Sequence, residues 1–142
     1  MILIDANLLI YAIDADSPHH GAARAWLEEA LSGTERVGLA WTVVLAFLRL
    51  TTRSGILRHP LPAADALAYV GSWFDQQCVR AVVPGEGHWP VLRNLLATAG
   101  TAGNLTSDAH LAALAIEHGA AVYSADNDFK RFSGLEHVNP LA

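Results

Sequence analysis

The sequence has one cysteine, Cys78, and no long apolar run. A single cysteine cannot form an internal disulfide, so we expect a buried thiol in a reducing cytoplasm. No run reaches the roughly 20 apolar residues of a membrane helix, which argues against a transmembrane segment. The apolar N-terminus is interrupted at Asp5 and follows no basic segment, so a signal peptide is not expected.

Charge is also scarce, and its sign is unfavourable for nucleic acid. Charged residues make up 16% of the chain, hydrophobic residues 52%, and the net charge is −5. These values exclude disorder and argue against RNA or DNA binding by bulk electrostatics. Every basic residue except Lys130 is an arginine, whose guanidinium group makes bidentate contacts with phosphate or carboxylate. Local recognition of either group therefore stays open.

The chain contains no repeat, low-complexity tract or linker, and its 142 residues fit one domain, 1–142. Apolar patterns and helix-end signals predict strands and helices in alternation. The expected strands are 2–4, 36–40, 79–83 and 121–124, and a short segment near His137 and Val138 closes the chain. The expected helices are 18–31, 42–52, 62–74, 88–99 and 107–118. Such alternation is typical of an α/β sandwich around a mostly parallel sheet.

Three acids stand where this fold would bring distant segments together. Asp5 ends the first strand, and Asp126 follows the strand at 121–124. Asp108 lies in the first turn of helix 107–118, which should run antiparallel to the strands and so begin at their carboxyl edge. Ligands usually bind at that edge of an α/β sheet. The sequence therefore predicts three carboxylates at one rim.

A rim of carboxylates favours a divalent cation, because clustered like charges repel one another. Mg²⁺ or Mn²⁺ prefers oxygen ligands, lowers the pKa of a bound water and stabilises charge on a phosphoryl oxygen. The site thus suits metal-assisted phosphodiester hydrolysis. Taken singly, each acid has a simpler explanation: Asp108 suits a helix N-terminus, and Asp126 and Asp128 suit turns. Asp5 is the exception, because an acid that ends a buried strand is costly without a partner.

Motifs at both ends of the chain resemble those of PIN domains of the VapC toxin type. They are "MILIDANLLIYA", "TSDAHLAALAIEHGAAVYSADNDF" and "FSGLEHVNP", and the middle matches in helix pattern and in "LAFLRLTTR". The resemblance covers essentially the whole chain. It implies a three-layer α/β/α sandwich, Mg²⁺- or Mn²⁺-dependent endoribonuclease activity, inhibition by a cognate antitoxin, and a homodimer.

The resemblance also implies site residues. It assigns the catalytic and metal-binding role to three acids: Asp5, Asp108 and Asp126. It assigns auxiliary roles to polar residues near them: Asp128, Asn7 and Ser124. Asn7 and Ser124 match positions that support the acids by hydrogen bonds.

One position departs from the family pattern. The family commonly has a glutamate on the helix after the second strand, near Leu45 to Phe47, whereas "WTVVLAFLRLTTR" contains no acid. This helix should begin at the same rim, so either three acids suffice with more water, or a second metal binds weakly. Some relatives share the acid-free pattern, and we do not interpret it as loss of activity.

Other side chains on this helix have two interpretations each. Arg49 and Arg53, one turn apart, would hold RNA phosphates or an antitoxin carboxylate, or else form a solvated, ion-paired face. Tryptophans belong more often to a core or an interface than to a platform for stacked bases. Trp41 is the exception that could stack on a base, because it lies beside the expected rim.

Two rival functions remain at this stage. A PIN fold without the glutamate could bind RNA or protein without cutting it. A signalling receiver domain also collects acids at a carboxyl sheet edge, but it needs a lysine after its last strands, and only Lys130 is available. Metal-dependent RNA cleavage would separate the enzyme from the first rival, and phosphorylation of an acid would reveal the second.

Overall fold

The computed structural model describes residues 1–142, in which strands and helices alternate. The strands are β1 (Ile2–Ile4), β2 (Val37–Ala40), β3 (Val79–Val82), β4 (Ala121–Tyr123) and β5 (His137–Val138). The α-helices are α1 (Ala6–Ile13), α2 (His20–Ser32), α3 (Trp41–Thr52), α4 (Ala63–Phe74), α5 (His88–Ala99) and α6 (Thr106–His118). Two 3₁₀ helices complete the set, η1 (Gly103–Leu105) and η2 (Asn127–Arg131). None of the helices has the length and apolar character needed to cross a membrane.

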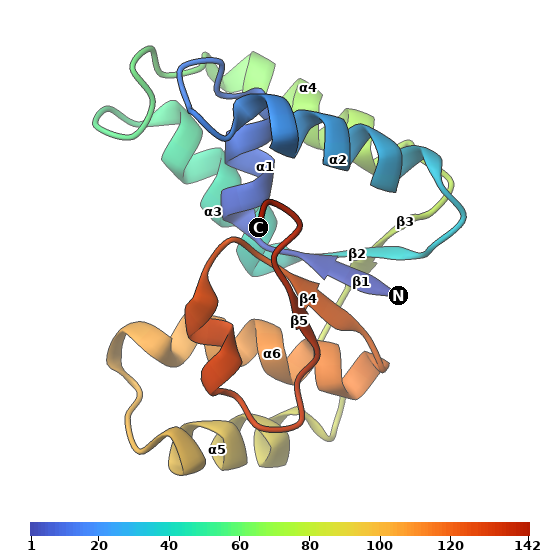
Figure 1. Cartoon of the computed structure of the whole chain (residues 1–142), viewed down its shortest axis with the longest axis vertical. Coiled ribbons are helices and arrows are strands. Elements are labelled where there is room, and N and C mark those ends of the chain that lie inside the picture. Colours follow the sequence, from blue (N-terminus) through green and yellow to red (C-terminus); the bar gives the residue numbers. More distant parts are fainter.

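The strands form one sheet in the order β3-β2-β1-β4-β5, and every neighbouring pair is parallel. Helices α1 to α4 lie on one side of this sheet, and α5 and α6 lie on the other (Figure 1). The predicted three-layer α/β/α sandwich with a parallel central sheet is therefore confirmed. Because all strands run the same way, their carboxyl ends meet at one edge.

The core extends over both faces of the sheet. One continuous cluster of 32 buried apolar residues reaches from Leu27 on α2 to Leu95 on α5. The central strand β1 is buried along its whole length. Gly38 on the adjacent strand β2 leaves room for side chains of the two flanking strands, because a Cβ there would overlap Leu3 of β1 and Val82 of β3.

The sequence pattern does not predict α1. Residues 6–13 are an almost continuous apolar run, in which helical and strand periods cannot be told apart. The strand passes into the helix without a loop because the Asp5 carboxylate accepts a hydrogen bond from the Ala6 amide, at 2.8 Å, and caps the helix. The helix expected at 18–31 begins at His20 instead, and the remaining ends agree to within about one residue.

Cys78, expected to be buried, is only half-buried. It directly precedes β3, which is an edge strand of the sheet. Its Sγ lies 3.3 Å from the carbonyl oxygen of Leu31 near the end of α2. The edge position explains why the thiol keeps partial access to solvent.

Candidate active site

The three acids predicted to share a rim do lie at the carboxyl edge of the sheet. Asp5 follows β1 directly, and Asp126 follows the adjacent strand β4 by three residues. Asp108 lies in the first turn of α6. Ile4 pairs with Tyr123, so the next residues along, Asp5 and Ser124, lie level with each other at the edge.

Ser124 links the two strand ends. Its side chain is fully buried, and its Oγ donates a hydrogen bond to Asp5 Oδ2 at 2.7 Å. The same Oγ accepts hydrogen bonds from the Asp126 amide, at 3.0 Å, and from Asn7 Nδ2, at 3.1 Å. Asn7 Nδ2 also lies 3.3 Å from Asp5 Oδ2, and Asn7 Oδ1 accepts from the Ala125 amide. Asn7 and Ser124 thus hold the Asp5 carboxylate and the loop that carries Asp126 in one network.

A second grouping involves Asp128. One carboxylate oxygen from each of Asp108, Asp126 and Asp128 can be chosen so that all three lie within 4.8 Å of one another. The Asp128 amide donates to Asp126 Oδ1 at 2.9 Å, which caps η2 and fixes the position of both residues. Asp5 lies outside this 4.8 Å group and joins it through Ser124. The structure therefore places Asp128 beside Asp108 and Asp126, where it can act as an auxiliary to them.

The electrostatics of the site reflect crowded like charges. Burial, and then the charges of Asp5, Asp126 and Asp128, raise the pKa of Asp108 from its ordinary 3.8 to about 6. Burial also raises the pKa of Asp5, although hydrogen bonds from Ser124 and Ala6 partly oppose this. The ion pairs of the protein involve other residues, so no lysine or arginine forms an ion pair with these acids.

A cleft of about 330 Å³ opens beside the acids. Asp5, Asp108 and, from α3, Leu45, Ala46 and Arg49 are among its lining residues. Of the positions near which the expected glutamate is missing, Leu45 and Ala46 thus face the cleft with apolar side chains, and Phe47 lies in the core. Of the two arginines predicted to bind RNA or antitoxin, Arg49 lines this cleft, whereas Arg53 ends α3 outside it and is exposed. A larger cavity, about 570 Å³ between α2 and α4, contains none of the acids of the rim.

The sequence matches the PIN domain family over residues 2–135. The chain belongs to the PIN domain family. It is 44% identical to Ribonuclease VapC37 of Mycobacterium tuberculosis over 142 residues, which cover 100% of this chain and 99% of that protein. It is 42% identical to Ribonuclease VapC33 of the same species, over 99% of each chain. These relatives make it a VapC-type PIN domain.

Solved structures share its fold at low sequence identity. VapBC2 from Rickettsia felis, bound to a DNA fragment from its promoter, superposes with a TM-score of 0.73 at 17% identity, over 98% of both chains. VapC20 of Mycobacterium tuberculosis, a Sarcin-Ricin loop cleaving toxin, gives a TM-score of 0.71 at 20% identity, over 99% of this chain and 100% of that one. The three-layer α/β/α fold of this chain is thus found in solved structures of VapC and VapBC proteins.

His137 is a residue of this PIN domain that sequence reasoning did not assign to the site. It lies on β5, and its Nε2 donates to the Ser124 carbonyl oxygen at 3.0 Å. Its ring stacks on Phe129, with centroids 5.7 Å apart. Its charge lowers the pKa of Asp5, against the larger effect of burial. The only signal in the sequence was its place in the closing motif "FSGLEHVNP".

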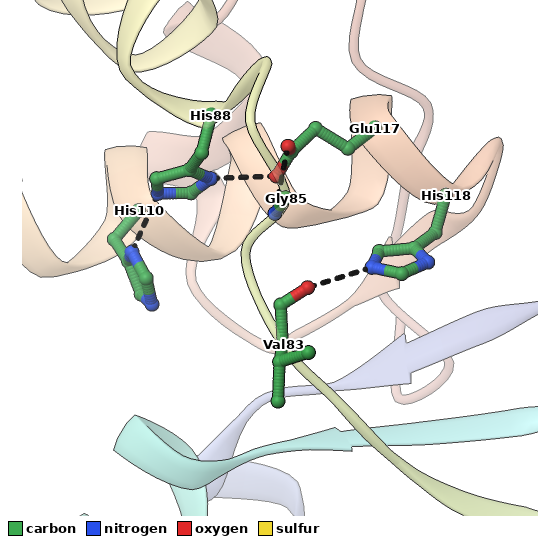
Figure 2. Close-up of polar contacts among 6 residues, drawn as sticks. All are labelled: Val83, Gly85, His88, His110, Glu117 and His118. Carbon is green, nitrogen blue, oxygen red and sulfur yellow. Dashed lines mark hydrogen bonds and ion pairs between the residues drawn. The ribbon is translucent and has the colours of Figure 1, made fainter.

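A second polar cluster, here called the Glu117 network, lies between α5 and α6 (Figure 2). Glu117 Oε2 lies 2.6 Å from His88 Nδ1, and Glu117 Oε1 accepts from the Gly85 amide at 3.2 Å. His88 Nε2 lies 2.9 Å from His110 Nδ1. Burial, and then the neighbouring His88, lower the pKa of His110. The network fastens α5 and the loop before it to the helix that carries Asp108.

Proposed function

We propose that this VapC-type PIN domain, taken as one domain over residues 1–142, is a metal-dependent endoribonuclease. In this proposal it is the toxin of a toxin–antitoxin pair and acts in the cytoplasm. The observation that carries it is the set of carboxylates at the carboxyl edge, none of which forms an ion pair with a lysine or arginine. Full-length relatives named ribonucleases, at 42–44% identity, support the choice of RNA as substrate.

The residues at the rim fit a hard divalent cation. Carboxylate oxygens are the ligands that Mg²⁺ and Mn²⁺ prefer. Burial, and then repulsion from the neighbouring acids, raises the pKa of Asp108, and a cation would relieve the repulsion. We assign metal binding to Asp5, Asp108 and Asp126, with Asp128 as an auxiliary ligand. When bound, the cation supplies a Lewis acid that stabilises negative charge on a phosphoryl oxygen and makes water more acidic.

The remaining polar side chains position these acids and the substrate. Ser124 and Asn7 direct donors at Asp5 Oδ2, while the Ala6 amide holds Oδ1, so the carboxylate has one fixed orientation. Arg49 lines the cleft beside Asp5 and Asp108 and would contact an RNA phosphate there. A local arginine and a bound cation would offset the net charge of −5 where the RNA backbone enters.

We extend the proposal to two protein partners, a cognate antitoxin and a second copy of the chain. Several solved neighbours of this fold are VapBC complexes, which supports an antitoxin partner. Arg49 and Arg53 are the candidates to receive an antitoxin carboxylate. Light scattering on the purified chain, alone and with the co-expressed product of an adjacent gene, tests both. A monomer that no such product binds would contradict this part.

The deciding experiment is an RNA cleavage assay with Mg²⁺, Mn²⁺ or EDTA. Wild type is compared with Asp5→Ala and Asp108→Asn, and Asp65→Asn serves as a control because Asp65 is an exposed acid on α4. We expect cleavage that requires metal, is lost in both rim variants and persists in the control. Cleavage in EDTA, or equal cleavage by all variants, would contradict the proposal.

One alternative has an observation in its favour. Helix α3 offers no acid to the cleft, which suits a PIN domain that binds RNA or protein without cutting it. RNA binding without metal-dependent cleavage would favour that reading. Membership of the PIN family removes the receiver-domain alternative.

A further inference from the structure

Trp41, the first residue of α3, presents a large aromatic surface to solvent. It follows β2 at the carboxyl edge, and 48% of its surface is exposed. Its ring packs against Phe74, with centroids 5.7 Å apart and an interplanar angle of 35°. The indole is therefore held in place by a neighbour while part of it remains free to contact another molecule.

This surface continues into the cleft beside the acids. Leu45 lies one turn after Trp41, is 59% exposed and lines the cleft together with Asp5 and Asp108. Arg49, one turn further, lines the same cleft. Side chains four residues apart lie on one helix face, about 6 Å apart along the axis. Helix α3 thus presents an aromatic ring, an apolar side chain and a guanidinium in a row that ends beside the carboxylates.

The row matches the chemistry of a single-stranded nucleotide chain. Unstacked bases bind aromatic and apolar faces, and phosphates bind arginine, so recognition of this kind needs no general positive charge. That property matters here, because the net charge of −5 argues against RNA binding by bulk electrostatics.

We infer that Trp41 and Leu45 form a platform that binds a base next to the scissile phosphate of a single-stranded RNA. Arg49 contacts the RNA backbone on the same helix face. This inference rests on the proposed ribonuclease function and adds how the substrate is held. A second copy of the chain is the competing occupant of this surface, and the experiment below distinguishes it.

The test compares Trp41→Leu, which keeps an apolar side chain, with Trp41→Phe, which keeps an aromatic face. Trp89→Leu is the matched control, because Trp89 is 64% exposed and lies on α5, across the sheet from α3 (Figure 1). The probe is a fluorescein-labelled single-stranded RNA oligonucleotide that wild type cleaves. Its Kd is measured by anisotropy with each substitution in an Asp108→Asn background, and KM and kcat are measured without it. Thermal unfolding checks that each variant is folded.

We expect Trp41→Leu to weaken RNA binding by about 5- to 150-fold, the loss of one base–aromatic stack. The loss should appear mainly in KM, Trp41→Phe should recover most of it, and Trp89→Leu should bind like wild type. An abasic nucleotide beside the cut should weaken wild type by a similar factor and should cost Trp41→Leu nothing more.

Three results would overturn the inference, and they are distinguishable. If wild type cleaves and Trp41→Leu has the same KM and Kd, the platform is wrong and the proposed function stands. If Trp41→Leu changes the oligomeric state in light scattering but leaves RNA affinity per site unchanged, the surface binds a second copy. If wild type neither binds nor cleaves the RNA panel with metal, the proposed function fails and the inference fails with it.

Discussion

Helix α6 carries two polar clusters of opposite character. The Glu117 network contains its own partners, because the Glu117 carboxylate accepts from a histidine nitrogen and a backbone amide (Figure 2). Asp108, nine residues earlier on the same helix, forms no ion pair, and burial and then the charges of the neighbouring acids raise its pKa to about 6. One cluster is complete within the protein, and the other would be completed by a cation from outside. Unpaired charge of this kind is more typical of a functional site than of a structural one.

The Glu117 network also helps to position the acids of the rim. Glu117 and His88 have only 12% and 13% of their side chains exposed, and they join α6 to α5 and to the loop before it. A firmly held α6 can present Asp108 to Asp126 and Asp128 despite the repulsion between them. We therefore expect the two clusters to respond oppositely to removal of a charge.

The largest expected contrast is in the stability of the metal-free protein. Glu117→Ala leaves His88 and the Gly85 amide without their acceptor, so we expect a loss of about 2–4 kcal/mol. This corresponds to a fall in Tm of roughly 10 °C. Asp108→Asn removes a repelling charge and should leave Tm unchanged or raise it. Thermal unfolding in EDTA measures both.

Glu28→Ala is the control for loss of a glutamate. Glu28 pairs with Arg24 on the exposed surface of α2, so its removal should cost no more than about 0.5 kcal/mol. Equal destabilisation by Glu117→Ala and Asp108→Asn would mean that the two clusters do not differ as described.

The next contrast is the response to a divalent cation. A ligand that binds only the folded state at 100 times its Kd adds about 2.7 kcal/mol to stability. We expect Mg²⁺ or Mn²⁺ to raise the Tm of wild type and of Glu117→Ala by similar amounts. Asp108→Asn should show little or no rise. If the cation raised the Tm of Asp108→Asn as much as that of wild type, the cation would bind somewhere other than the rim.

A smaller effect on metal affinity is expected when a residue that positions an acid is removed and the acid itself is kept. Ser124→Ala removes the 2.7 Å donor to Asp5 Oδ2 but no carboxylate, so we expect Mn²⁺ affinity to fall by about 10- to 100-fold. Isothermal titration calorimetry measures the Kd. Ser72→Ala is a matched control, since the Ser72 hydroxyl is exposed and bonds only the Tyr69 carbonyl oxygen. Unchanged affinity in Ser124→Ala would show that this network does not position a ligand.

The fold and the rim of acids were predictable because both depend on local patterns. Alternating strands and helices imply a parallel sheet, and Asp5, Asp108 and Asp126 each adjoin the end or start of an element that the pattern marks. Helix α1 was missed because its apolar run carries no period, although the cap at Asp5 was available as a signal.

The Glu117 network could not be predicted in the same way. His88 lies 22 residues from His110 and 29 from Glu117, and the approach of these residues depends on how α5 packs on α6. The closeness of Asp128 to the acids likewise depends on the turn of η2, which Asp126 caps. Contacts of this kind between side chains depend on tertiary packing, and the spacing of residues along the sequence does not specify that packing.

The smallest predicted effect is the pH dependence of the metal-free protein. Folding raises the pKa of Asp108 from 3.8 to about 6, so between these values the folded state binds more protons than the unfolded state. The stability from this group is therefore present below pH 3.8 and is lost as pH rises through about 6. Because Asp108 is only partly buried, we expect on the order of 1 kcal/mol, or a few degrees in Tm.

The Tm difference between wild type and Asp108→Asn, measured in EDTA from pH 4 to 7, isolates this contribution from those of other groups. Wild type should lose stability relative to the variant as pH rises. With saturating Mn²⁺ the sign should reverse, because protons compete with the cation for the same carboxylates and binding strengthens as pH rises. A slope of the same sign with and without Mn²⁺ would mean that Asp108 does not bind the cation. The contrast between the Glu117 network, whose partners all belong to the protein, and the acids around Asp108, which bind a cation, would then be wrong.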